Sequence, residues 1–153
     1  MEINNDRRPM LVNHLKEMLG DLKGKTIGLL GLSFKPNTDD MRDAPSITIS
    51  DLLLAGGAKV KAYDPVAMEI AKPLLPNVIL CTDPYELAEG CDALVIVTEW
   101  NEFKQLDLSV IKNLMKQPVI MDGRNIYEPE KVIKMGFRYR GLGRGFNGNK
   151  YKE

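Results

Sequence analysis

A loop rich in charged residues is the part of this sequence best suited to bind an anion. It spans residues 32–43 and lies between the first predicted strand and the helix that follows it. Its length of about a dozen residues exceeds the roughly 2 to 6 usual for such a connection, and long loops in compact domains commonly carry function. Pro36 favours an extended backbone at Lys35, so we expect the Lys35 ammonium to point outward, where it and the Arg42 guanidinium can contact phosphate.

The same loop also has a purely structural interpretation. Phe34 can simply fill the core, and Arg42 can staple the loop by pairing with one of its carboxylates, Asp39, Asp40 or Asp43. The residue types alone leave the binding and the structural interpretation open.

Two more polar segments follow predicted strands and are expected at the same edge of the sheet. Residues 98–103 follow the most apolar strand, and residues 122–125 follow the next one. Open α/β sheets bind ligands outside the carboxyl ends of their strands. Gly123 permits a tight turn that can direct Arg124 across those ends. Alternatively, the two aromatic residues of the first segment form a hydrophobic lid, and Arg124 is a solvated surface residue.

Other patterns of chemistry are not supported. Residues 28–31 form only GxxG, and the glycine-rich residues 141–146 lack the last glycine of GxGxxG, so dinucleotide binding of the usual kind is disfavoured. Cys81 and Cys91 fit no metal-ligand or disulfide pattern and are expected to be small buried residues. His14, the only histidine, is expected to be exposed on the polar side of the first helix. We therefore assign no catalytic residue and no metal ligand.

These segments must be positioned by helices and strands that alternate along the chain. An amphipathic helix is predicted over residues 6–22, and later helices begin near residues 45, 65, 84, 108 and 129. The predicted strands are residues 25–30, 59–63, 78–80, 92–98, 119–121 and 137–140. This alternation predicts an α/β fold, a Rossmann-like doubly wound parallel sheet of about six strands preceded by one helix. The predicted division is a connecting helix in residues 1–23, a binding domain in 24–146 and a frayed tail in 147–153.

Composition limits the possible partners. The 153 residues carry 21 Lys and Arg against 21 Asp and Glu, so no overall basic charge favours nucleic acid or an anionic membrane. The sequence shows neither a signal peptide nor a long apolar run, and a cytoplasmic location is expected.

The charged segments, taken in order, closely resemble those of the UDP-glucose/GDP-mannose dehydrogenase family. The resemblance rests on residues 31–46 (GLSFKPNTDDMRDAPS), 62–65 (AYDP), 98–103 (TEWNEF) and 122–125 (DGRN). It covers nearly the whole chain and corresponds to the last, UDP-binding domain of such enzymes, with the first helix similar to the end of their interdomain helix.

The resemblance implies a four-electron oxidation of a sugar C6 alcohol to a carboxylate, with two NAD and a thiohemiacetal on a cysteine. It implies that Phe34, Lys35 and Arg124 contact the nucleotide sugar, a UDP-sugar, and that Arg42 reaches NAD held by the N-terminal domain of the same enzyme. This sequence has neither the NAD fingerprint nor the glycine-flanked cysteine of that chemistry. The isolated chain is therefore expected to be inactive, as the binding domain of an enzyme of polysaccharide biosynthesis.

Several alternatives stay open. The 98–103 and 122–125 segments are most similar to members that act on UDP-glucose, but UDP-N-acetylmannosamine and GDP-mannose remain possible substrates. A stand-alone nucleotide-binding regulatory module is a second interpretation, and an interaction domain using the first helix is a third. The family resemblance also implies a homodimer for the complete enzyme.

Overall fold

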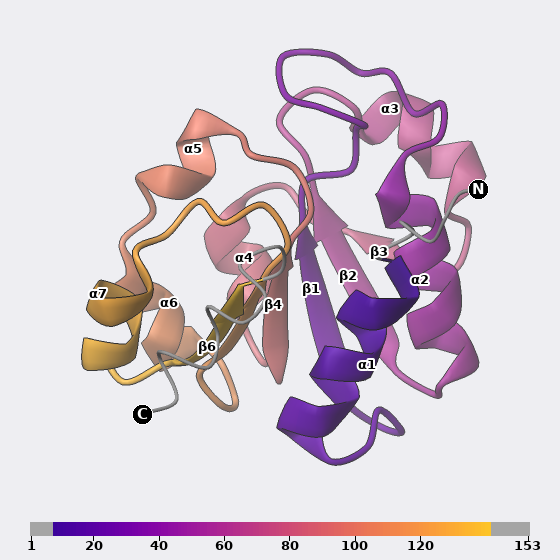
Figure 1. The fold of residues 1–153 in the computed structure, drawn as a ribbon. Coiled ribbons are helices and arrows are strands. Elements are labelled where there is room, and N and C mark those ends of the chain that lie inside the picture. The colour runs from indigo at the N-terminus through magenta and orange to yellow at the C-terminus, as the bar shows by residue number, and fades with distance from the viewer. Residues whose placement is uncertain (1–7, 142–153) are drawn as a thin grey trace, which may run out of the picture.

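The fold is built on one parallel sheet, as the alternating pattern predicts (Figure 1). A computed structural model describes residues 8–141 of the chain. The strand order is β3-β2-β1-β4-β5-β6, and every neighbouring pair is parallel. The strands are β1 (Thr26–Leu30), β2 (Lys59–Tyr63), β3 (Ile79–Leu80), β4 (Ala93–Ile96), β5 (Val119–Asp122) and β6 (Arg138–Gly141). The order reverses between β1 and β4, the point at which doubly wound sheets bind their ligands.

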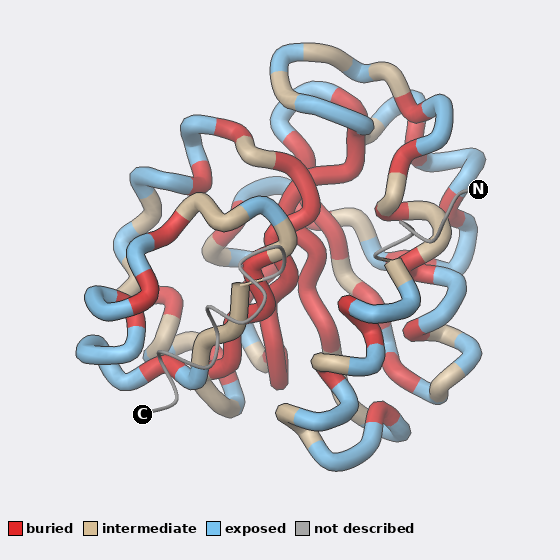
Figure 2. Tube along the Cα trace, in the orientation of Figure 1, coloured by how far each residue is buried: buried red, intermediate tan, exposed pale blue. Residues whose placement is uncertain are grey.

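Helices cover both faces of the sheet. On one face lie α1 (Arg8–Leu19) and α2 (Pro45–Ala55), with α3 (Met68–Ala71) and the short 3₁₀ helix η1 (Lys72–Leu74) at its β3 side. The opposite face is covered by α4 (Pro84–Ala88), α5 (Asn101–Lys104), α6 (Leu108–Leu114) and α7 (Pro129–Lys134). Figure 2 shows the central strands buried between these layers, while the outer surfaces of the helices are exposed.

The core consists of two apolar clusters, one on each side of the sheet. Successive side chains of a strand point to opposite faces, so Leu29 and Val95 enter the cluster under α1 and α2. Leu30 and Ile96 enter the cluster under α4 to α7. Burial on both faces explains why these strands are continuous apolar runs and show no polar alternation.

The first helix differs from its prediction at the end that the structure describes. It ends at Leu19 and not at Leu22, because Gly20 adopts a positive φ of 87° and breaks the helical backbone. Leu22 is nevertheless buried in the core. The predicted start at residue 6, the predicted tail and most of the 141–146 glycine segment lie outside residues 8–141, and the domain boundaries remain predictions.

His14 is not the exposed residue that the sequence predicts. Its side chain is only 22% exposed, and its Nδ1 lies 3.7 Å from Glu17 Oε1. Burial, followed by the nearby Arg140 charge, lowers the pKa of His14 below its ordinary value. The error arises because Arg138 and Arg140 of β6 reach α1 and partly cover this side of the helix, which helical periodicity alone cannot reveal.

The helix after β2 begins later than the sequence predicts. Asp64 and Pro65 were expected to begin a helix, but α3 starts at Met68. The Asp64 carboxylate accepts hydrogen bonds from the backbone N–H groups of Val66 and Ala67, at 2.9 and 2.8 Å, and so holds a turn before the helix. No helix within residues 8–141 has both the length and the apolar character needed to cross a membrane.

Candidate functional site

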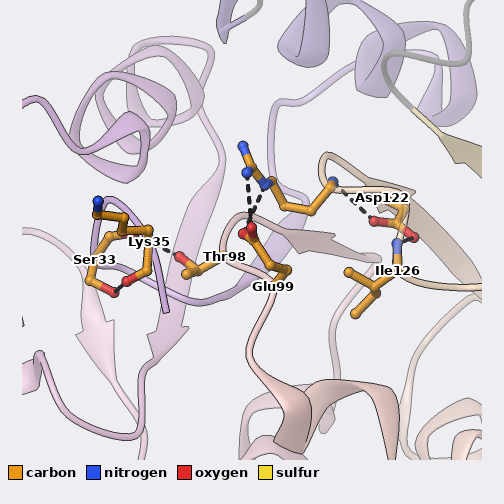
Figure 3. Close-up of polar contacts among 7 residues, drawn as sticks. Ser33, Lys35, Thr98, Glu99, Asp122 and Ile126 are labelled. Carbon is orange, nitrogen blue, oxygen red and sulfur yellow. Dashed lines mark hydrogen bonds and ion pairs between the residues drawn. The ribbon is translucent and has the colours of Figure 1, made fainter. Parts of the chain in front are cut away.

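The three segments singled out in the sequence meet at one edge of the sheet. Loop 32–43 leaves β1, segment 98–103 leaves β4 and segment 122–125 leaves β5, and these strands are neighbours. In Figure 1 the first of these loops arches beyond the carboxyl ends of the strands, and Figure 3 shows Lys35, Thr98, Glu99 and Asp122 at this edge. The prediction that they share one rim is confirmed.

The base of loop 32–43 is fixed by buried hydrogen bonds. The backbone N–H groups of Leu32 and Ser33 donate to Asp64 Oδ2 at 2.7 and 3.2 Å. The Leu32 carbonyl accepts from the Ser46 hydroxyl at 2.7 Å, and the Ser33 carbonyl accepts from the Thr98 hydroxyl at 2.8 Å. The backbone N–H and carbonyl of both residues are therefore hydrogen-bonded before the loop reaches solvent.

Gly31 brings the ends of β1 and β4 into contact. Its φ is 100°, a conformation that residues with a side chain rarely adopt. A Cβ at this position would lie 2.5 Å from Thr98 Cβ and 2.7 Å from the Thr98 backbone nitrogen. Only glycine allows this approach, and the approach makes the Ser33–Thr98 hydrogen bond possible.

Phe34 and Lys35 lie beyond this fixed base, at the surface. Phe34 is 46% exposed, so the interpretation that it fills the core is wrong. Its backbone N–H donates to the Asp40 carbonyl at 3.0 Å and closes the loop. The Lys35 side chain is exposed, while its carbonyl accepts from the Ser33 hydroxyl at 2.9 Å. The side chains of both residues are therefore accessible to solvent at the rim.

Arg42 forms the staple that was one of its two interpretations. Its guanidinium donates to both oxygens of Asp40, at 3.0 and 2.9 Å, although 90% of the side chain is exposed. The hydrogen bonds from Arg42 lower the pKa of Asp40 to about 2, with a smaller contribution from the charge of Lys35. Ion pairs between solvent-exposed groups are weak, so Arg42 can exchange partners readily, and its contact with NAD remains a prediction.

The loop that carries Arg124 is organised by Asp122, a fully buried carboxylate. It accepts from the backbone N–H groups of Arg124, Ile126 and Tyr127, and from the Tyr139 hydroxyl at 2.7 Å. This set of donors compensates for burying the charge and fixes the turn at the end of β5.

Gly123 lets this turn lie directly against β4. Its N–H donates to the Ile96 carbonyl at 3.0 Å, and a Cβ here would lie 2.7 Å from that oxygen and 3.2 Å from Leu11 Cδ1. The turn sends Arg124 back across the end of β4, as predicted. Its Nε and Nη2 donate to Glu99 at 2.9 and 3.0 Å, leaving Nη1 for another acceptor.

Glu99 was not singled out in the sequence, although it lies in a segment that was. Burial raises its pKa, but the hydrogen bond and charge of Arg124 outweigh this, and the pKa of Glu99 lies below its ordinary value. The ion pair is half-exposed at this rim, with the Arg124 side chain 43% exposed, so Arg124 is not merely a solvated residue. The sequence does contain one indication of this pair, since Glu99 and Arg124 each follow one of two consecutive predicted strands.

The aromatic residues of segment 98–103 cover the helical layer, as the alternative interpretation held. Phe103 is fully buried and Trp100 is 8% exposed. Trp100 also donates from its indole Nε1 to Asp64 Oδ2 at 3.2 Å. Its role is therefore polar as well as apolar, and no pattern of residues near Trp100 indicates this partner.

The rim is suited to binding a polyanion and not to covalent catalysis. Lys35 and Arg124 supply cationic donors, and the ring of Phe34 is exposed on the same loop as Lys35. Cys81 and Cys91 are both buried, and burial raises their pKa values, that of Cys91 to about 12. Both residues are thus the small buried cysteines that the sequence predicts, and a thiol with a raised pKa is mostly protonated at neutral pH.

Comparison with a family profile gives a direct match. Residues 28–129 match the profile described as "UDP-glucose/GDP-mannose dehydrogenase family, UDP binding domain". All three rim loops lie within the matched range.

Individual relatives agree with this match. The chain is 48% identical over 141 residues to the UDP-glucose 6-dehydrogenase of Rhizobium meliloti, covering 92% of this chain and 32% of the relative. It is 46% identical over 145 residues to the UDP-glucose 6-dehydrogenase YwqF of Bacillus subtilis, covering 94% of this chain and 33% of that protein. The chain thus spans about a third of the length of these curated relatives.

Solved structures show the same similarity. A UDP-glucose dehydrogenase from Pyrobaculum islandicum superposes with a TM-score of 0.75 at 36% identity, over 88% of this chain and 29% of that one. A UDP-D-ManNAc dehydrogenase from Pyrococcus horikoshii gives 0.70 at 31% identity, over 90% of this chain and 30% of the other.

Proposed function

This chain belongs to the UDP-glucose/GDP-mannose dehydrogenase family, and from that premise we propose that it is the nucleotide-sugar-binding part of an NAD-dependent UDP-glucose 6-dehydrogenase. The complete enzyme would oxidise UDP-glucose to UDP-glucuronate. The observation that carries the proposal is that Lys35 and Arg124 lie on loops at one edge of the sheet, next to its switch point, with Phe34 exposed on the same loop as Lys35.

The chemistry of the rim fits a nucleoside diphosphate. We propose that Lys35 neutralises the diphosphate as a point charge and that Arg124 donates to an anionic oxygen through its Nη1 edge. Glu99 holds the other edge of the Arg124 guanidinium, so both contacts can exist together. Phe34 would contact the nucleotide sugar with its exposed ring.

Arg42 has a different proposed partner. We infer that it meets NAD held by another domain of the enzyme, exchanging Asp40 for a cofactor phosphate. NAD supplies the hydride acceptor when bound. The oxidation is proposed to need parts of the enzyme beyond those in this chain, and the complete enzyme is proposed to be a cytoplasmic homodimer, as the family resemblance implies.

The choice of sugar rests on degree of similarity. Among the solved structures, the UDP-glucose dehydrogenase shares 36% identity with this chain and the UDP-D-ManNAc dehydrogenase shares 31%, and the curated relatives at 48% and 46% are both named UDP-glucose 6-dehydrogenase. This difference supports UDP-glucose over UDP-N-acetylmannosamine. GDP-mannose as substrate, and a stand-alone regulatory module that binds a nucleotide, are the competing proposals.

Calorimetric titration of the chain with UDP, UDP-glucose and GDP tests the proposal. We expect the uridine nucleotides to bind and GDP to bind more weakly. Arg124→Ala should weaken UDP binding by about tenfold to a hundredfold, since a charged hydrogen bond is worth about 1.5 to 3 kcal/mol. Arg124→Lys should recover only part of this, because an ammonium keeps the charge but loses the planar fork.

A matched control is available in Arg140 of β6, which pairs with Glu17 of α1 at 2.7 Å and is also partly exposed. Arg140→Ala should leave UDP binding unchanged. Both arginine variants should lose at most about 1 kcal/mol of stability, as for surface ion pairs. The assignment of Arg124 is wrong if its alanine variant melts earlier but binds UDP as the original chain does.

A further inference from the structure

Asp64 is a buried carboxylate whose two oxygens bind different segments of the chain. It lies directly after β2 and is 1% exposed. Its Oδ1 accepts from Val66 and Ala67 and serves only the turn before α3. Its Oδ2 accepts from loop 32–43 and from segment 98–103, which leave two other strands.

One branch of this arrangement leads to Lys35. Asp64 Oδ2 binds the N–H groups of Leu32 and Ser33, and the Ser33 hydroxyl lies 3.4 Å from the same oxygen. That hydroxyl also donates to the Lys35 carbonyl at 2.9 Å. The position of the Lys35 backbone is therefore set through Ser33 by a carboxylate on the neighbouring strand.

The other branch leads to Arg124. The indole N–H of Trp100 donates to Asp64 Oδ2 at 3.2 Å, and Trp100 follows Glu99 in sequence. Glu99 in turn accepts both donors of the Arg124 fork. Fixing the Trp100 ring fixes the backbone from which Glu99 reaches Arg124.

A carboxylate suits this place better than the isosteric amide. All the groups that approach Asp64 are donors, and a carboxylate is acceptor-only on both oxygens. An asparagine would turn an NH₂ group toward the donors on one side and leave them unpaired in a buried site. We propose that Asp64 is the positioning residue that sets Lys35 and Arg124 as one site for the nucleotide sugar.

This inference rests on the proposed function, because it assumes that Lys35 and Arg124 share a ligand. It concerns how the ligand-binding groups are held, and it adds no contact between Asp64 and the ligand. The prediction is that disturbing Asp64 changes affinity at the rim more than an equally buried carboxylate elsewhere does.

Asp92 provides that matched comparison. It is 4% exposed and lies at the amino end of the sheet, where it accepts from the Thr26 backbone N–H at 2.9 Å and from Gln117 Nε2 at 3.1 Å. Asp92→Asn therefore disturbs a buried, hydrogen-bonded carboxylate at the end of the sheet away from the rim.

The experiment measures UDP affinity and melting temperature for Asp64→Asn, Trp100→Phe and Asp92→Asn. We expect Asp64→Asn to weaken UDP binding by about tenfold or more. Trp100→Phe, which removes the indole N–H donor and leaves a smaller ring, should weaken it by about threefold to tenfold. Asp92→Asn should bind UDP as the original chain does, even where its melting temperature falls. Equal losses of affinity in the two aspartate variants would overturn the inference, since they would reflect general instability.

Trp100→Phe decides the matter if Asp64→Asn does not fold. Unchanged UDP affinity in this milder variant overturns the positioning role. A further readout separates this inference from the proposed function: amide hydrogen exchange at Leu32 and Ser33 should be slow in the original chain and faster in Trp100→Phe. If UDP does not bind at all, the proposed function fails, and unchanged exchange at these amides would then independently overturn the role of Asp64.

Discussion

The two ends of the sheet are closed in different ways. At the amino end, two connections are joined by a hydrogen bond between backbone groups. The Gly24 N–H donates to the Gly57 carbonyl at 3.0 Å, and both glycines have positive φ angles. At the carboxyl end, buried carboxylates at Asp64 and Asp122 gather the N–H groups of irregular loops. Asp92 is the exception at the amino end, and it accepts a single backbone N–H.

The difference shows where this fold accepts the cost of burying charge. The two glycine turns satisfy part of each other's backbone, so they need no buried side-chain acceptor for these groups. A long loop that must hold Lys35 or Arg124 in a fixed place cannot pair all of its own backbone N–H groups. A buried carboxylate, which only accepts hydrogen bonds, supplies the missing partners. Buried carboxylates are thus concentrated beneath the proposed ligand-binding cations.

The largest expected difference in stability is between alanine substitutions of a glycine at each end of the sheet. Gly31→Ala should lose about 2 to 5 kcal/mol of stability, because it adds a left-handed backbone penalty to a clash with Thr98. Gly24→Ala should lose only about 1 to 2 kcal/mol, because its φ is also positive but nothing lies within 4 Å of its Cβ position. Urea unfolding of both variants measures this, and equal losses would remove the distinction.

The next effect compares the carboxylates. Asp122→Asn should destabilise the fold by about 1.5 to 3 kcal/mol, since the amide leaves some of the donors in its loop unpaired. Asp92→Asn should lower the free energy of unfolding by about half as much, because Asp92 accepts hydrogen bonds from fewer donors. Chemical denaturation at neutral pH provides the measurement. A larger loss at Asp92 would mean that the amino end depends on its carboxylate more than the geometry indicates.

The smallest expected effect concerns the exposed Asp40–Arg42 ion pair, which lies at the same end of the sheet as the buried carboxylates. Asp40 has a lowered pKa of about 2, so its pair with Arg42 should be complete above pH 3.8 and be lost as the pH falls through 2. In Arg42→Gln, NMR titration should show the Asp40 pKa rising toward its ordinary value of 3.8. An unchanged titration would show that something other than Arg42 holds this carboxylate ionised.

Much of this architecture could be predicted because it depends on local patterns. Apolar runs and glycine stops indicate the parallel sheet, and the positions of loops after strands indicate that Lys35 and Arg124 share an edge. The partners of Asp64 could not be found in this way, since Trp100 and Ser33 are distant in sequence and meet it only when β1, β2 and β4 lie together. The pairing of Glu99 with Arg124 likewise requires the adjacency of β4 and β5.

The burial of Cys81 and Cys91 has a practical consequence for spectroscopy. These are the only cysteines in the sequence, and neither presents a reactive thiolate at neutral pH. A cysteine introduced at the exposed Asp39 would therefore be labelled selectively by a maleimide dye, with the native thiols left in place. The motion of the loop that carries Lys35 and Arg42 can then be followed by fluorescence in an otherwise unaltered protein.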